Sequence, residues 1–263
     1  MRKYHADVKN SERYRIISVE GAFHGRSLAC IAAGRQEKHL AGFGPIVDGF
    51  DQVAFGNLNE MRAAITPDTA GIVIEPIQGE GGIRPIDANY LKELRGITNE
   101  FGLLLMFDEV QCGVGRTGAL YAYEHSGIAP DILASAKGLG GGFPIGACLA
   151  SGKIASVMVA GSHGSTFGGN PLAMAVGNAV LDVLLEEGFL DGVSSVASYL
   201  KDQLDHLTQR HDEIFTGVRG VGLMLGLTDG AALGLEDGRA DGLLQEAVRR
   251  AGHELDRVQD SGG

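Results

Sequence analysis

Two ionisable residues follow apolar runs in this sequence. Asp108 comes after five apolar residues, Leu103 to Phe107, and Lys137 comes after the run "ILASA". A carboxylate at the end of a buried strand is desolvated and requires a cationic or strongly donating partner. A lysine in such a place has little room to reach solvent, and desolvation favours its neutral, nucleophilic amine. Taken alone, Asp108 is equally well explained as a turn cap and Lys137 as a surface lysine.

Together, the two residues favour one kind of cofactor chemistry. An amine that forms a Schiff base and an acid that holds a protonated pyridine nitrogen are what a protein contributes to the chemistry of pyridoxal phosphate (PLP). Phe23 offers an aromatic face to the pyridine ring. Ser165 and Thr166 offer hydroxyl groups to a phosphate, within a glycine-rich stretch that is otherwise a turn. We therefore expect a PLP site that includes these residues.

The stretch "GVGRTG" (113–118) has the G-x-G-x-x-G spacing of a dinucleotide-binding turn. Such a turn joins a strand tightly to a helix, and an acid about 20 residues later ends the next strand. Here "DEVQC" separates the apolar run from the glycines, and the nearest acid, Asp131, begins a strand. An NAD-binding oxidoreductase is thus the weaker hypothesis, and the glycines are expected to shape the edge of the site.

The composition excludes several classes of protein. The 33 acidic and 22 basic residues give a net charge of −11, which argues against a nucleic-acid-binding surface. The start lacks the apolar segment of a secretory signal, and no window approaches the ~18 apolar residues of a membrane span. The 3 cysteines are isolated, which indicates neither a disulfide framework nor a metal site. We expect a cytoplasmic enzyme that acts on small molecules, with no nucleic acid or membrane as partner.

Four short apolar runs alternate with helical stretches, which is typical of an α/β fold with a mostly parallel sheet. The runs cover residues 14–21, 71–77, 103–109 and 131–138. The carboxyl ends of parallel strands share one edge of a sheet, where ligands bind, so the residues that follow the runs are expected to meet there.

Periodicity predicts helices around these strands and after them. They cover 87–102, 170–190, 198–213 and 242–259, and Asn170 is a candidate cap with Pro171 at the first helical position. The stretch "GLMLGL" (222–227) reads as a strand, and no later strand follows to pair with it.

An ordered set of motifs over residues 1–227 resembles the class III (ornithine-type) aminotransferases. The motifs are "EGAFHGRS", "GFGPIVDGF", "IEPIQGEGGIRP", "LLMFDEVQCGVGRTG", "YEHSGIAPDILASAKGLGGGFPIGA" and "HGSTFGGNPLAMAV". The resemblance implies PLP as cofactor and the fold of the type I PLP-dependent transferases. That fold has a mostly parallel sheet in a large domain and a smaller C-terminal α+β domain.

The resemblance also implies roles at the cofactor for the matching residues. Lys137 would bind PLP through a Schiff base and move a proton between substrate and cofactor, and Asp108 would keep the pyridine nitrogen protonated. Val110 would pack on the ring face opposite Phe23. Gln111 would lie near the hydroxyl group of the ring.

Four further residues are implied at the substrate and the phosphate. Arg26 would bind a substrate carboxylate through two parallel hydrogen bonds, which a lysine cannot copy. Glu80 resembles a carboxylate that pairs with an arginine while an ω-amine donor is bound. Ser165 is implied at the substrate. Thr166 is implied at the phosphate and would reach across a homodimer interface into the partner's site.

Within the family, the motifs are most similar to those of bacterial acetylornithine aminotransferases. These enzymes of arginine biosynthesis move the terminal amino group of N-acetylornithine to 2-oxoglutarate. Ornithine, succinylornithine, succinyl-diaminopimelate and 4-aminobutyrate stay open as alternative amino donors.

Two segments of the family have no counterpart in this sequence. One is an upstream Ser-Gly-Ala-type turn that cradles the phosphate, and the other is a downstream arginine that holds the α-carboxylate of glutamate. We therefore expect a chain truncated at both ends, with a PLP-binding large domain over 1–186 that lacks its N-terminal part and a partial small domain over 187–263. A catalytically silent remnant, or a partner for a full-length subunit, is the competing hypothesis.

Overall fold

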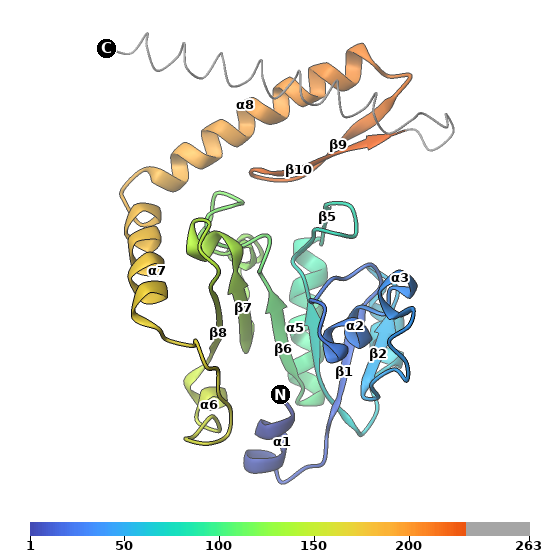
Figure 1. Cartoon of the computed structure of the whole chain (residues 1–263). Helices are drawn as coiled ribbons and strands as arrows, with labels where there is room; N and C mark the ends of the chain where they lie inside the picture. Colours follow the sequence, from blue (N-terminus) through green and yellow to red (C-terminus); the bar gives the residue numbers. More distant parts are fainter. Residues whose placement is uncertain (230–263) are drawn as a thin grey trace.

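The structure is a computed structural model and describes residues 1–229 of the chain (Figure 1). At its centre is a 6-stranded sheet with the order β2-β1-β3-β6-β7-β8. Neighbouring strands are parallel, except that β8 runs antiparallel to β7. The strands are β1 (Arg15–Val19), β2 (Phe50–Val53), β3 (Thr69–Ile74), β6 (Leu104–Asp108), β7 (Ile132–Ala136) and β8 (Gly146–Ala150). The predicted α/β fold with a mostly parallel sheet is confirmed.

The four predicted apolar runs form β1, β3, β6 and β7, which lie next to one another in the sheet. Their continuous apolar character reflects burial on both faces, which is most complete in β3, where all six residues are buried. Strands β2 and β8 were not expected. All five residues of this edge strand β8 are exposed, although its sequence, GACLA, is largely apolar.

The remaining elements connect these strands or follow the sheet. The helices are α1 (Arg2–Lys9), α2 (Leu28–Gly34), α3 (Glu37–Leu40), α4 (Leu58–Ala63), α5 (Ala88–Phe101), α6 (Gly152–Ala155), α7 (Pro171–Leu184) and α8 (Phe189–Arg210), with the 3₁₀ turns η1 (Ala122–Ser126) and η2 (Lys137–Gly140). The short strands β4 (Ile77–Gln78) and β5 (Arg84–Pro85) pair with each other, as do β9 (Phe215–Val221) and β10 (Met224–Asp229).

Helix α5 begins and ends where its sequence predicts, whereas α7 begins as predicted and ends at Leu184, six residues before the predicted end at 190. Asp87 caps α5 by accepting hydrogen bonds from the backbone N–H groups of Asn89 and Tyr90, and Gly102 ends it in the left-handed conformation with φ 65°. Asn170 caps α7 through the N–H of Ala173, and Pro171 is its first residue. Such a side-chain cap stabilises a helix by about 1 kcal/mol.

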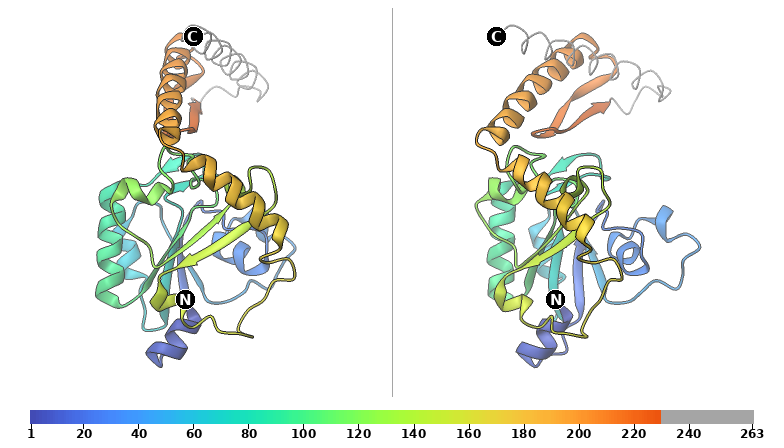
Figure 2. Two further views of the ribbon diagram at one scale, coloured as in Figure 1. Left: turned by 90° about the vertical axis from the view of Figure 1, so that its left-hand side faces the viewer. Right: turned by 60° about the vertical axis from the view of Figure 1, so that its left-hand side comes forward.

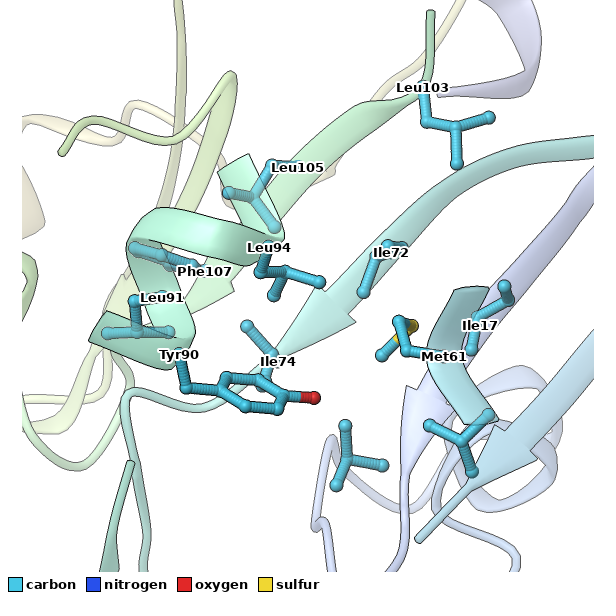
Figure 3. Packing of buried hydrophobic residues seen from close by; sticks show 12 residues of the cluster. Ile17, Met61, Ile72, Ile74, Tyr90, Leu91, Leu94, Leu103, Leu105 and Phe107 are labelled. Carbon is cyan, nitrogen blue, oxygen red and sulfur yellow. The ribbon is translucent and has the colours of Figure 1, made fainter. Parts of the chain in front are cut away.

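The main core lies between one face of the sheet and helices α4 and α5. Figure 3 shows Ile72, Ile74 and Leu105 of the sheet facing Leu94 of α5 and Met61 of α4. These side chains are almost completely removed from water, which stabilises each by roughly 1.5–3 kcal/mol relative to exposure. The core therefore holds the central strands, and with them the ends of those strands, in fixed positions.

Helices α7 and α8 and the β9–β10 hairpin follow the sheet (Figures 1 and 2). Helix α7 packs against η2, and α8 packs against β9. Helix α8 begins at Phe189, nine residues before the predicted start at 198. The apolar residues of its first turns already recur at helical spacing, at Phe189, Leu190, Val193, Val196 and Ala197.

The structure corrects the expectation for "GLMLGL". That strand, β10, pairs with β9, which lies upstream in the chain, so the expectation that it has no partner strand is wrong. The predicted helix over 242–259 lies outside the described residues, and the boundary between 186 and 187 stays a prediction. None of the helices in the described part of the chain is long and apolar enough to cross a membrane.

Candidate active site

The carboxyl ends of β1, β3, β6 and β7 surround one small cavity. It has a volume of about 90 Å³, and we call it the cofactor cavity. The residues that line it are Phe23, His24, Gly25, Glu75, Asp108, Val110, Gln111 and Lys137. Five residues predicted at the cofactor are among them, which is the convergence that a parallel sheet produces.

Asp108 is the buried acid of the cofactor cavity, with 8% of its surface exposed. His24 Nδ1 lies 2.8 Å from its Oδ2 atom, and the backbone N–H of Val110 donates to its Oδ1 atom over 3.1 Å. These donors hold the carboxylate in one orientation and compensate its loss of water. His24 was not predicted, although it stands next to Phe23 in "GAFHGRS", because a histidine in a loop has no distinctive pattern.

Glu75 is a second acid that was not predicted as a site residue. Its two oxygens accept the backbone N–H groups of Phe23 over 2.8 Å and of Gly79 over 3.3 Å. Burial raises the pKa of the Glu75 carboxyl, and the two N–H donors partly oppose this effect. Glu75 therefore fixes the backbone that presents the Phe23 ring to the cofactor cavity.

Lys137 begins η2 directly after β7 and lines the cofactor cavity. Its side chain is exposed, so the expectation that it would be desolvated is wrong for the described part of the chain. The reason is that the strand ends one residue earlier and η2 turns the lysine out of the sheet. Its φ of 48° lies in the left-handed region, which is costly for a residue with a Cβ atom.

Arg26 and Glu80 lie outside the cofactor cavity, and both are exposed. The Arg26 guanidinium stands 5.4 Å from the centre of the Phe23 ring. Arg26 is therefore near the cavity and bound to its rim through a cation–π contact.

Ser165 and Thr166 are not brought to the cofactor cavity within this chain. Both are exposed and lie in the segment between α6 and α7. Figure 1 shows that segment beside the lower end of β8, whereas the cofactor cavity is at the carboxyl ends of the parallel strands.

The glycines of "GVGRTG" have a packing role. The turn opens no α-helix, and the next element is the 3₁₀ turn η1. Gly115 has φ 79°, and a Cβ atom there would lie 2.7 Å from Leu184 of α7. The turn therefore lets the C-terminal elements approach the large sheet, and the dinucleotide interpretation of the motif has no support in its geometry.

Glu109 holds the 3₁₀ turn η1 from inside the protein and was not predicted as important. It has no exposed surface, and its carboxyl accepts the backbone N–H groups of Ala122 over 2.6 Å and of Tyr123 over 2.8 Å. Burial raises the pKa of Glu109 to about 7, although these hydrogen bonds favour the ionised form.

The residues of the cofactor cavity fit PLP. Asp108 offers a buried, oriented carboxylate to a pyridine nitrogen, Phe23 and Val110 offer ring contacts, and Lys137 offers an amine at the same cavity. Each oxygen of Asp108 has a lone pair left for a further donor, since each is contacted by one group. The donor set thus matches the cofactor in charge, in hydrogen bonding and in aromatic surface.

Comparisons with known proteins agree with this interpretation. The family model described as "Aminotransferase class-III" matches residues 1–251. The acetylornithine aminotransferase of Mesorhizobium japonicum is 59% identical over 226 residues, which are 86% of this chain and 57% of the relative. The chain therefore spans little more than half the length of this curated relative.

Two solved structures show the same fold. The ornithine aminotransferase of Toxoplasma gondii superposes with a TM-score of 0.83 at 32% identity, over 88% of this chain and 56% of that one. An amine transaminase of an uncultivated Pseudomonas species in its PLP-bound form superposes with a TM-score of 0.77 at 29% identity, over 84% and 56%. The family match covers nearly the whole chain, and the fold and the cavity agree with it. The chain belongs to the class III aminotransferases, a family of PLP-dependent enzymes.

Proposed function

We propose that this chain contributes the cofactor-binding centre of an aminotransferase that moves the terminal amino group of N-acetylornithine to 2-oxoglutarate in arginine biosynthesis. The observation that carries the proposal is that Asp108, which ends β6, and Lys137, which follows the neighbouring strand β7, line one cavity together with Phe23. An oriented acid, an amine and an aromatic ring are the groups that PLP chemistry requires of a protein.

Six residues of the cofactor cavity then have defined tasks. Bound PLP supplies an electron sink for the substrate carbon. Asp108 holds the proton on the pyridine nitrogen, and His24 keeps the Asp108 carboxylate in place. The Lys137 amine binds the cofactor and carries a proton to and from the substrate carbon. Phe23, Val110 and Gln111 orient the ring.

The substrates are inferred from the relatives and from charge. The Mesorhizobium relative is named for acetylornithine, and the ornithine, succinylornithine, succinyl-diaminopimelate and 4-aminobutyrate donors remain alternatives. Arg26 is the proposed partner of a substrate carboxylate, Glu80 the proposed gating carboxylate, and Ser165 a further substrate contact. We also infer a cytoplasmic location, which is supported by the free thiols of Cys30, Cys112 and Cys148.

A homodimer would explain the place of Thr166. The segments around this residue expose large apolar side chains, and large exposed apolar surface marks interaction sites. They are Met158 (54% exposed), Val159 (61%), Phe167 (80%) and Leu172 (60%). Thr166 is therefore positioned to enter a partner's site if this surface is buried between two copies, and size-exclusion chromatography with light scattering tests the oligomeric state.

The proposal is tested by adding PLP to the purified 263-residue chain and to its Lys137→Ala variant. We expect a visible absorption band of protein-bound cofactor that the variant lacks. Turnover of N-acetylornithine with 2-oxoglutarate tests the activity itself. An absorption band without turnover would favour the catalytically silent alternative. That alternative is supported by the exposure of Lys137 and by the distance of Ser165 and Thr166 from the cofactor cavity. A band that persists unchanged in the variant would refute the role of Lys137.

A further inference from the structure

The ring of Phe23 is in contact with His39, a residue outside the motifs of the family resemblance. The centres of the two rings are 5.6 Å apart and their planes are inclined at 75°, which is an edge-to-face arrangement. His39 belongs to the short helix α3 and is half-buried. Phe23 is among the described residues that line the cofactor cavity and His39 is not, so the histidine acts on the cavity through the phenylalanine.

The peptide group between Ala22 and Phe23 is held at both of its polar atoms. The side-chain amide of Gln36 donates to the Ala22 carbonyl over 2.9 Å, and the N–H of Phe23 donates to Glu75 over 2.8 Å. The helix preceding Gln36 also approaches closely, because a Cβ atom at Gly34 would lie 3.0 Å from the Ala22 oxygen. With the backbone fixed, the freedom of Phe23 that remains is rotation about its two side-chain torsions.

Gln36 also anchors the helix that carries His39. It is the residue before α3, and its carbonyl accepts the backbone N–H groups of His39 over 2.9 Å and of Leu40 over 3.2 Å. The residue whose side chain holds the peptide group of Phe23 therefore holds the backbone of His39 as well. Because both rings are anchored through Gln36, their contact is fixed by the fold and limits the torsions open to the Phe23 ring.

The charges around His39 favour its neutral form. Partial burial and the positive charges of Arg26 and Lys38 lower the pKa of the imidazole, and the negative charge of Glu80 opposes them. These three residues belong to the loop after β1, to α3 itself and to the loop between β4 and β5. A neutral imidazole packs on Phe23 as an aromatic ring and adds no charge beside the cofactor cavity.

We propose that His39 is a positioning residue of the cofactor cavity, whose imidazole holds the Phe23 ring in the orientation that stacks on the cofactor ring. The inference rests on the proposed function in one respect, because that function makes PLP the molecule on which Phe23 stacks. His39 itself touches neither the cofactor nor a reacting atom, and its effect passes through Phe23.

Pyridoxine 5′-phosphate separates stacking from covalent chemistry. It has the ring and the phosphate of PLP, but an alcohol in place of the aldehyde, so it forms no Schiff base with Lys137. We would titrate it by calorimetry into the 263-residue chain and its variants. His39→Leu keeps the volume and removes the aromatic ring, and is expected to weaken binding roughly three- to tenfold, the range that an edge-to-face pair supplies. His39→Phe restores the aromatic contact and is expected to bind within about twofold of the unchanged chain.

Two further measurements show whether the effect passes through Phe23. In a Phe23→Leu background, His39→Leu is expected to cost no additional affinity, because such a double-mutant cycle isolates the pairwise contact. In the cofactor-free chain, the ring current of Phe23 should shift the imidazole C–H resonances of His39, and Phe23→Leu should abolish this shift. Glu37→Ala, an exposed change in the same helix, is the matched control and is expected to bind like the unchanged chain.

Several outcomes would overturn the inference. They are absence of pyridoxine 5′-phosphate binding, equal binding by His39→Leu and the unchanged chain, an equal loss in Glu37→Ala, or a His39→Leu effect that persists in the Phe23→Leu background. The PLP absorption band and turnover are measured separately, so the two proposals fail separately. A Phe23-dependent effect of His39 without a PLP band or turnover refutes the proposed function alone. A band and turnover, with a His39 effect that is independent of Phe23, refute this inference alone.

Discussion

The Nδ1 atom of His24 lies 2.8 Å from the Oδ2 atom of Asp108, and the two side chains are only 7% and 10% exposed. One residue follows β1 and the other ends β6, so the contact joins two strands that are separated in the sheet by β3. The Nε2 atom of His24 is buried and has no partner among the described residues. A neutral ring with its hydrogen on Nδ1 leaves no buried donor unpaired, and this tautomer donates to the carboxylate.

The contact predicts a graded response to substitution of His24. Asparagine places an amide N–H near the position of Nδ1, whereas leucine has a similar volume and no donor. A hydrogen bond to a charged group contributes about 1.5–3 kcal/mol. We expect His24→Leu to weaken PLP binding at least tenfold and His24→Asn to weaken it much less, as measured by titration of the cofactor absorption band.

The exposed His206 on α8 supplies the control, since His206→Asn should leave cofactor affinity unchanged. A proton resonance for the hydrogen-bonded Nδ1–H should be present in the cofactor-free chain and disappear in Asp108→Asn. Equal affinities of the leucine and asparagine variants would show that His24 only fills space.

Much of this site can be predicted from the sequence, because the ends of buried strands can be located from their apolar runs. The runs before Asp108 and Lys137 are buried on both faces, and a parallel sheet brings their ends to one edge. His24 and Glu75 are less predictable, because their roles depend on contacts across 84 and 52 residues of sequence. The exposure of Lys137 depends on where β7 ends, and an uncertainty of one residue reverses the direction of a side chain.

At Lys137, the backbone conformation favours glycine, whereas the proposed function requires the lysine amine, so stability and function conflict at this position. Its φ of 48° is unfavourable for any residue with a Cβ atom and favourable for glycine. Lys137→Gly and Lys137→Ala both remove the amine, so neither should bind PLP covalently. We expect the glycine variant to be more stable than the alanine variant by about 1 kcal/mol, measured by urea unfolding at equilibrium. An alanine variant that is the more stable of the two would contradict the left-handed backbone.

Glu109 predicts a specific dependence of stability on pH. Its pKa is about 7 in the folded protein, against an ordinary value of 4.5, so between these values the folded state binds more protons than the unfolded state. The contribution of Glu109 is therefore fully present below pH 4.5 and is lost as the pH rises to about 7. The difference between the two values corresponds to about 3 kcal/mol.

The Glu109→Gln variant isolates this effect. Burial lowers the pKa of His5, which gives the opposite slope below pH 6.5 in both proteins and cancels in the difference between them. We expect the free energy of unfolding of the unchanged chain, relative to the variant, to fall as the pH is raised from 4.5 to 7 and to stay constant above it. Parallel curves would mean that Glu109 titrates at its ordinary pKa.

Substitution of Gly222 tests how closely the β9–β10 hairpin packs on the 113–118 turn. A Cβ atom there would approach backbone atoms of Arg116 and Thr117, which cannot move without separating the two elements. Gly127 is a matched control, because its φ of 68° is similar to the 60° of Gly222 and nothing lies within 4 Å of a Cβ atom there. Alanine at either position incurs the left-handed cost of roughly 1–2 kcal/mol, and only Gly222→Ala adds a collision.

We expect Gly222→Ala to lower the free energy of unfolding by at least ~1 kcal/mol more than Gly127→Ala in urea titrations. Hydrogen exchange should also become faster at the Leu223 amide, which donates to Arg116. If the two variants lose equal stability and the Leu223 amide stays protected, the hairpin is not packed on the turn as closely as its backbone indicates.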